Sequence, residues 1–255
     1  MLLCIDIGNT NIVFGLVEND KVVRRWRIKT VKDATADEIG VAVMNIFEHS
    51  GIKPGDIKDI IITSVVPSLM KTIEEFSSRY FNLSPLEVGD GIKTGMPIRY
   101  DKPEEVGADR IVNAVAGYEK YRSGLIIIDF GTATTFDCVS RDGEFIGGAI
   151  APGLIISCEA LFERASKLPR IETFAMPEEV IAKDTISAMN AGIICGYAGL
   201  VDGIVNRMKK EIGYDIKVLA TGGIAPLVFG ESTVINHIEE DLTIEGLIII
   251  YKRNR

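Results

Sequence analysis

An internal repeat constrains the fold of this chain more than any other feature of its sequence. The chain has 255 residues, and the segment LLCIDIG (residues 2–8) returns as LIIIDFG (residues 125–131), 123 residues later. At the same offset, the turn pair Asn19-Asp20 is matched by Asp142-Gly143, and each pair lies between runs typical of β-strands. Each half is therefore predicted to open as strand, Asp-x-Gly turn, strand, tight turn, strand.

Helical spacing follows each set of three strands. In the first half, it predicts helices at 35–48 and 68–80 around a buried strand at 59–63. In the second half, we expect helices at 153–165, 184–208 and 242–251, with a strand at 216–220. A β-β-β-α-β-α order that occurs twice predicts an α/β fold of two duplicated lobes.

A short polar connector separates the two lobes. Pro97 and Pro103 punctuate it before a helix expected at 108–121. We therefore expect an N-terminal lobe at 1–105 and a C-terminal lobe at 106–255, with a cleft between them.

Composition excludes several classes of function. With 36 acidic against 28 basic residues and a net charge of −8, the sequence has no basic footprint for nucleic acid. No uninterrupted apolar run reaches the roughly 18 residues of a membrane span, and no leader peptide is recognisable. The four scattered cysteines are expected to be buried, reduced thiols, so we expect a cytoplasmic protein. The two histidines are His49, at the end of a helix, and His237, so we expect a carboxylate to carry out proton transfer.

The two Asp-x-Gly turns carry the chemistry of phosphate binding. In the first, Gly8 allows close backbone approach, Asn9 and Thr10 donate hydrogen bonds, and Asp6 could hold a water-bound Mg²⁺. The second turn, DFGTATT (129–135), sets three threonine hydroxyls beside a carboxylate. Either turn alone could be a plain hairpin turn, but duplication with the same charge favours a pair of phosphate-binding turns. A third glycine turn, ATGG (220–223), follows a strand and fits an adenosine contact, although any joint between a strand and a helix could use two glycines.

These turns resemble the two phosphate segments and the adenosine segment of the actin-like ATPase and sugar kinase superfamily. Within it, the chain resembles the type III pantothenate kinase family. The matching segments are DIGNTNIVFGL (6–16), SVVP (64–67), GIKTG (91–95), VGADRIVNAVAG (106–117), DFGTATTFD (129–137), GGAIAPG (147–153) and ATGG (220–223). They occur in the family's order along essentially the whole chain.

The resemblance implies a fold, a reaction and a set of site residues. The fold would be two actin-like (ribonuclease H-like) lobes with an ATP cleft between them, and the reaction would be ATP-dependent phosphorylation of the primary hydroxyl of pantothenate, the first step of coenzyme A biosynthesis. The implied nucleotide-binding residues are Asp6, Ile7, Gly8, Asn9, Thr10, Asn11, Ile12, Val13, Thr132, Gly222 and Gly223. The implied pantothenate-binding residues are Tyr100, Gly107, Ala108, Asp109, Arg110 and Thr185. Asp129 would bind a monovalent cation, K⁺ or NH₄⁺, and the protein would be a homodimer in which Thr185 reaches the partner's substrate.

Asp109 is the predicted catalytic residue. An aspartate in the first turn of a helix is favoured by the dipole, so we expect a low pKa and a carboxylate that accepts the hydroxyl proton during phosphoryl transfer. An isolated aspartate at this position would more often be a helix cap than a catalyst, but Arg110 beside it is an anion-binding group. Ala182 and Asp184 depart from the family's usual Gly-Lys-Asn-Thr before Thr185, and Asp184 adds a negative charge near an anionic substrate.

Two other functions remain open from the sequence. One is a phosphotransferase or phosphatase of the same fold with a different substrate, because the phosphate turns do not select the acceptor. The other is a non-catalytic transcriptional accessory factor, as described for some relatives of the family. The acidic charge balance and the intact Asp109-Arg110 pair argue against the second function.

Overall fold

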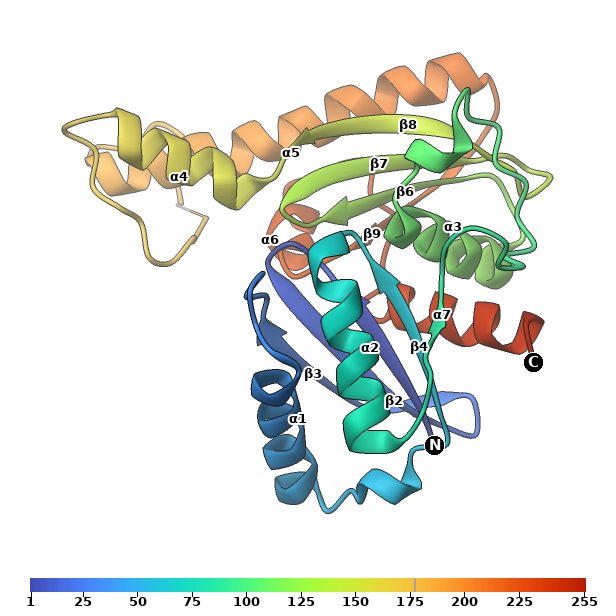
Figure 1. The fold of residues 1–255 in the computed structure, drawn as a ribbon. Helices are drawn as coiled ribbons and strands as arrows, with labels where there is room; N and C mark the ends of the chain where they lie inside the picture. The colour runs from blue at the N-terminus through green and yellow to red at the C-terminus, as the bar shows by residue number, and fades with distance from the viewer. Residues whose placement is uncertain (177) are drawn as a thin grey trace. The chain divides into compact units, whose positions relative to one another are not determined.

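The chain forms two compact units. Unit 1 comprises residues 1–119 and 241–255, and unit 2 comprises residues 120–240. The computed structural model describes residues 1–176 and 178–255 (Figure 1). Each unit is built on one five-stranded mixed sheet.

The two sheets share one strand order, which confirms the predicted duplication. The order is β3-β2-β1-β4-β5 in unit 1 and β8-β7-β6-β9-β10 in unit 2, with antiparallel pairs among the first three strands and parallel pairs among the rest. The strands of unit 1 are β1 (Leu2–Ile7), β2 (Asn11–Glu18), β3 (Lys21–Lys29), β4 (Asp59–Ser64) and β5 (Leu86–Glu87). Those of unit 2 are β6 (Leu125–Phe130), β7 (Ala133–Val139), β8 (Phe145–Pro152), β9 (Lys217–Thr221) and β10 (His237–Ile238).

The helices confirm the helical spacing of the sequence. Their bounds are α1 (Ala36–Ser50), α2 (Pro67–Phe81), α3 (Ala108–Tyr121), α4 (Leu154–Arg164), α5 (Thr185–Ile212), α6 (Ala225–Phe229) and α7 (Leu242–Arg253). Two short 3₁₀ helices, Pro54–Asp56 and Pro103–Glu105, and the two-residue strands β5 and β10 were not anticipated, because such short elements carry no periodicity. His49 lies in the last turn of α1, as expected, with Nδ1 2.8 Å from the carbonyl oxygen of Asn45.

In unit 1, helices cover both faces of the sheet. Alternate residues of β1 and β4 join α1 and α2 in one core, which includes the fully buried rings of Phe47 and Phe76. On the opposite face α7 packs so closely that a Cβ on Gly15 would lie 2.6 Å from the Ile244 side chain. Helix α7 also touches α3, where Thr243 Oγ1 donates to Asn113 Oδ1 at 2.7 Å.

The compact units do not follow the boundary expected between residues 105 and 106. Helix α3 up to Glu119 and the whole of α7 belong to unit 1, because α7 packs on β1 and β4 and α3 packs against α7. Packing of this kind brings together segments far apart in the chain, which a boundary drawn from sequence cannot show. The cleft expected between the lobes stays a prediction.

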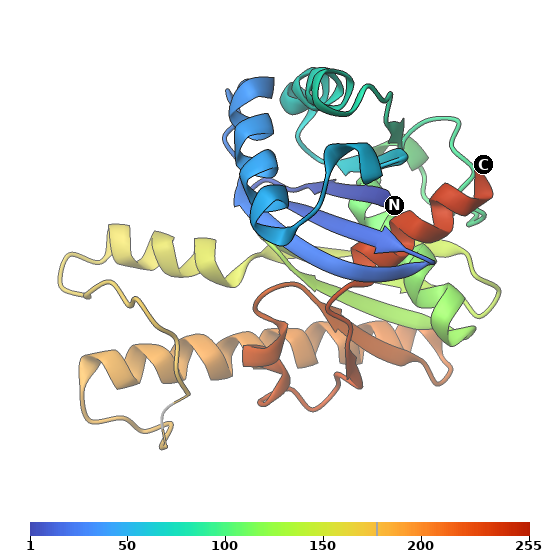
Figure 2. The same cartoon turned by 90° about the horizontal axis from the view of Figure 1, so that it is seen from below.

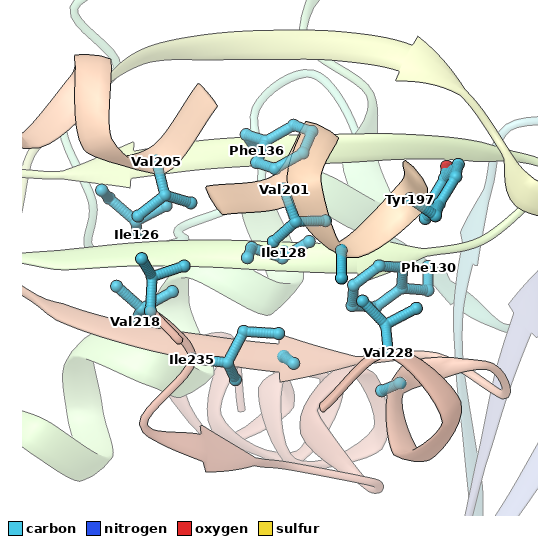
Figure 3. Packing of buried hydrophobic residues seen from close by; sticks show 14 of the residues in the cluster. Ile126, Ile128, Phe130, Phe136, Tyr197, Val201, Val205, Val218, Val228 and Ile235 are labelled. Carbon is cyan, nitrogen blue, oxygen red and sulfur yellow. The ribbon is translucent and has the colours of Figure 1, made fainter. Parts of the chain in front are cut away.

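In unit 2, the long helix α5 crosses one face of the sheet. Figure 3 shows Val201 and Val205 of α5 packed beside Ile126, Ile128 and Phe136 of the strands, and all five belong to one buried cluster. Beyond the sheet, α4 and the first half of α5 extend as a projecting arm (Figures 1 and 2).

Helix α5 has the length and composition of a membrane span, although 44% of its most apolar window is buried inside the structure. Burial of this kind is typical of the core helix of a globular unit. Three of the four cysteines are buried, as expected, whereas Cys195 on α5 is only half-buried.

Candidate functional site

The first Asp-x-Gly turn is a four-residue loop at the carboxyl end of β1. Ile7 pairs with Ile12, and the Gly8 N–H donates to the carbonyl oxygen of Asn11 at 3.0 Å. Thr30 braces the loop from the end of β3, since its hydroxyl donates to the Gly8 carbonyl at 2.7 Å. The bracing leaves Asn9 and Thr10 exposed, in positions suited to hydrogen bonds with a ligand.

Two members of the expected nucleotide-binding set, Ile7 and Ile12, point into the core of unit 1. Their side chains are fully buried, so they can offer a ligand only backbone groups. Asp6 and Val13, on the other face of the sheet, are half-buried.

The structure adds Thr63 as a neighbour of Asp6. The two residues pair in register on parallel strands, so their side chains share one face of the sheet. The Thr63 hydroxyl is fully buried and has no hydrogen-bond partner in the described part of the chain. The sequence gives a weak signal for it, a single threonine at the end of the isoleucine run 60–62, where the second half has Thr221.

The second Asp-x-Gly turn is one residue shorter than the first. Phe130 pairs with Thr134, and the Gly131 N–H donates to the Ala133 carbonyl at 3.1 Å. Of the three hydroxyls expected to face phosphate, only that of Thr132 belongs to an exposed residue.

The expectation for Thr134 is wrong. Thr134 lies on the core face of β7, fully buried, with its hydroxyl 2.5 Å from the Tyr197 hydroxyl. Thr135 is half-buried and donates to Asp137 at 3.2 Å. Because side chains alternate along a strand, three hydroxyls so close in sequence cannot all face one ligand.

Two glycines pack against this loop from other elements of unit 2. Gly222, with φ of +95°, lies so close to Phe130 that a Cβ would be 2.6 Å from its carbonyl oxygen. Gly153, just before α4, donates its N–H to the Thr132 carbonyl at 3.1 Å. The loop at residues 131–132 is therefore held by the segments before α4 and after β9. Gly223, beside Gly222, is exposed.

Asp129 lies among hard oxygen donors. It pairs in register with Thr135 of β7 and Thr221 of β9, so the three side chains share the face opposite the α5 core. Carboxylate and hydroxyl oxygens suit K⁺ or Mg²⁺, and the donor set fits a cation at this position. Among the residues that the structure describes, no three His, Cys, Asp or Glu side chains gather as a closed metal site. Mg²⁺ bound through one carboxylate and substrate phosphates needs no such group.

In unit 1, the segments around Asp6, Ser64 and Asp109 come together. The Val65 N–H donates to the Ile7 carbonyl at 3.1 Å. A Cβ on Gly107 would lie 3.6 Å from the Val65 side chain and 2.6 Å from Asp109 Oδ1. The start of α3 is therefore adjacent to the carboxyl ends of β1 and β4.

Asp109 occupies the first turn of α3, as expected, but the expectation of a low pKa is wrong. Burial of the carboxylate raises its pKa above the ordinary value of aspartate, and this outweighs the hydrogen bond that it accepts from the Arg110 N–H at 2.8 Å. The dipole argument omitted desolvation, which depends on tertiary packing. Arg110 is buried beside it, and Tyr100 and Ala108 are half-buried.

Thr185 is the exposed first residue of α5, which begins at the outer end of the arm (Figure 1). The neighbouring departure from the family pattern has a local reason: Asp184 caps the helix, accepting the Ser187 N–H at 2.9 Å. This hydrogen bond lowers the pKa of Asp184, so its negative charge is held at the helix N-terminus.

Comparison with known sequences identifies the family of this chain. The family model described as Type III pantothenate kinase matches residues 2–207. A Type III pantothenate kinase from Geotalea uraniireducens is 59% identical over 255 residues, which cover all of this chain and 99% of that protein. One from Citrifermentans bemidjiense is 58% identical, with 100% of each chain covered.

Solved structures of low identity show the same fold. A Campylobacter jejuni protein assigned to the Baf family of transcriptional activators matches with a TM-score of 0.61 at 18% identity, covering 99% of this chain and 98% of that one. A ROK family glucokinase from Streptomyces griseus, in complex with glucose and AMPPNP, matches with a TM-score of 0.55 at 11% identity, covering 98% of each. These likenesses show an actin-like ATPase and sugar kinase fold, and with the match over residues 2–207 and the 59% identity they place this chain in the type III pantothenate kinase family.

Proposed function

We propose that this chain transfers the γ-phosphoryl group of ATP to the primary hydroxyl of pantothenate, with Asp109 accepting the hydroxyl proton. The attacking oxygen forms a bond to phosphorus, the bond from phosphorus to the β-γ bridging oxygen breaks, and ADP leaves. Phosphorylation of pantothenate in coenzyme A biosynthesis is the activity of the family to which the chain belongs.

The placement of Asp109 carries the proposed mechanism. Its carboxylate is half-buried at the start of α3, beside the end of β1 where the first phosphate turn lies. A pKa raised by burial makes it a stronger proton acceptor than an exposed aspartate once it is ionised. Arg110 would supply the positive charge for the pantothenate carboxylate or the phosphoryl group, and Tyr100, Gly107 and Ala108 would line the same substrate.

An acceptor panel tests the proposed substrate. ADP release should depend on pantothenate and stay at background with glucose, N-acetylglucosamine or no acceptor. Release with a sugar and none with pantothenate would favour the alternative of a phosphotransferase with another acceptor.

The nucleotide would be held by backbone and side-chain donors in each unit. In unit 1 these are the turn residues Gly8–Asn11 together with Asp6, Ile7, Ile12 and Val13, and in unit 2 they are Thr132, Gly222 and Gly223. Asp6 would hold Mg²⁺ through water, and the ion when bound neutralises charge on the phosphate oxygens.

The proposed monovalent cation site is Asp129. Its support is the shared face with Thr135 and Thr221, which offers hard oxygens next to the phosphate-binding turn. Activity should be high in K⁺ or NH₄⁺ and lost in Na⁺ at matched ionic strength. Equal rates in Na⁺ and K⁺ would remove this role from Asp129.

We further propose a homodimer formed through the arm of unit 2, in which Thr185 completes the pantothenate site of the partner. Gly192, Gly196 and Gly199 form an exposed stripe on α5, where a Cβ added to any of the three would meet no atom within 4 Å, so a second helix could approach closely. Exposed apolar side chains continue over the arm, namely Ile155, Ile156, Leu161, Val180, Ile181 and Ile186. Other apolar side chains of α5, among them Met189 and Tyr197, are buried within unit 2.

Subunit mixing tests the shared site. Inactive Asp109→Asn and Thr185→Ala proteins, mixed and allowed to exchange subunits, should regain activity because each heterodimer has one intact site. No recovery despite proven exchange, or a monomer that is active, would contradict the homodimer.

We place the enzyme in the cytoplasm, without a nucleic acid or membrane partner, on its free cysteines and net charge of −8.

A further inference from the structure

Tyr197 lies at the middle of α5 and faces the second phosphate turn. Its ring packs beside Phe130, with centroids 6.3 Å apart (Figure 3). The side chain is buried, and its hydroxyl contacts two elements at once: the Thr134 hydroxyl of β7 at 2.5 Å and the Pro152 carbonyl of β8 at 2.7 Å.

The direction of these hydrogen bonds follows from the inventory of protons. A phenol has one proton, and a carbonyl oxygen can only accept, so Tyr197 donates to Pro152. The Thr134 hydroxyl must then donate to the Tyr197 oxygen. The result is one directed chain, from Thr134 through Tyr197 to Pro152, that connects two strands and the helix.

This series of hydrogen bonds leads to the exposed tip of the second phosphate turn. Pro152 precedes Gly153, whose N–H donates to the Thr132 carbonyl at 3.1 Å. The position of Thr132 therefore depends on the segment that Tyr197 holds. No other side-chain donor to the Pro152 carbonyl occurs in the hydrogen bonds of the described residues.

We propose that Tyr197 is a positioning residue for the nucleotide: its hydroxyl fixes Pro152 and Gly153, and through them the Thr132 loop that receives the phosphates. This inference rests on the proposed role of Thr132 in nucleotide binding. Tyr197 is buried and acts through the loop, so loss of its hydroxyl should change the KM for ATP and leave the KM for pantothenate unchanged.

The test is Tyr197→Phe, which keeps the ring and removes the hydroxyl. We expect the KM for ATP to rise by roughly tenfold, the effect of losing one hydrogen bond, and the KM for pantothenate to stay within about twofold. The matched control is Val201→Ala, a buried apolar truncation one turn later on the same helix, in the same cluster. It should lower the melting temperature without changing the KM for ATP. If both variants lose stability and neither changes the KM for ATP, Tyr197 is merely structural and the inference is wrong.

A double variant covers the case in which Tyr197→Phe does not fold because it leaves the buried Thr134 hydroxyl without an acceptor. Tyr197→Phe with Thr134→Val removes that hydroxyl too, while Pro152 still lacks its donor. The KM for ATP should rise in the double variant as well. An unchanged KM in a folded double variant overturns the proposal.

Hydrogen exchange at the Gly153 amide separates this inference from the function on which it rests. Faster exchange in Tyr197→Phe together with a raised KM for ATP supports both. Unchanged exchange overturns the positioning role. A third outcome is faster exchange in Tyr197→Phe with an unchanged KM for ATP. If Thr132→Ala also keeps the wild-type KM for ATP, the nucleotide role of Thr132 is refuted instead.

Discussion

Gly153 offers a sharp test of the second phosphate turn, because its surroundings leave no room for a single methyl group. A Cβ at this position would lie 2.2 Å from the Thr132 carbonyl oxygen and 2.6 Å from that of Gly131, both backbone atoms of the turn. The Gly153 backbone, with φ of −67° and ψ of 157°, is a conformation that alanine adopts freely. Any effect of Gly153→Ala therefore comes from the collision and not from backbone strain.

The size of the effect follows from the distances. Real Cβ contacts stay above 3.0 Å, so the turn must move by about 0.8 Å or more. A misplacement of about 1 Å in a catalytic site can lower the rate by roughly 10²-fold. We expect kcat/KM for ATP to fall by about this factor, and the free energy of unfolding to fall by about 1–3 kcal/mol from overpacking.

The assay is coupled ADP release at saturating pantothenate, with thermal melting of the same samples. Gly230→Ala is the matched control in unit 2, since its backbone is helical and a Cβ added there would enter open space. It should keep the wild-type kinetics. A Gly153→Ala enzyme with kcat/KM for ATP within about twofold of wild type would refute the reasoning.

Three further predictions concern unit 1. Because burial raises the pKa of Asp109, its ionised form is unfavourable in the folded state. Asp109→Asn should therefore raise the melting temperature at pH 7–8, and this gain should disappear toward pH 4. Equal melting temperatures of wild type and variant at pH 8 would contradict this prediction. For the same reason kcat/KM of the wild type should fall on acidification with an apparent pKa above that of an ordinary aspartate, and a pH–rate profile that is flat down to pH 4 would exclude Asp109 as the base. Gly246→Ala would bring a Cβ on α7 within 2.2 Å of the Val112 carbonyl oxygen on α3. The free energy of unfolding, measured by urea denaturation, should fall by about 1–3 kcal/mol. A variant as stable as the wild type would show that these helices can separate without loss of stability.

The duplicated strands were predictable because their apolar runs and Asp-x-Gly ends are visible in the sequence. The difference in turn length was not, because the repeat continues without a gap while the strand pairing shifts by one residue. The side of the sheet on which Thr134 lies could have been read from the alternation with Phe136, a core residue two positions later.

The pKa shift of Asp109 could not be predicted without the folded structure. Its place in the first turn of a helix was predictable, and the helix begins where the sequence indicated, at Ala108. The direction of its pKa shift was not, since desolvation depends on how the folded chain buries the carboxylate. The same limit applies to α7, whose contacts with β1 join residues more than 200 positions apart.

Pantothenate-dependent ADP release by Asp109→Asn, measured together with the affinity for ATP, tests the central claim most directly. The substitution keeps the shape of the side chain and removes the proton acceptor. We predict that turnover falls by roughly 10²-fold or more while the dissociation constant for ATP stays within about twofold of wild type. Near-normal turnover in this variant would contradict the role of Asp109 as the base.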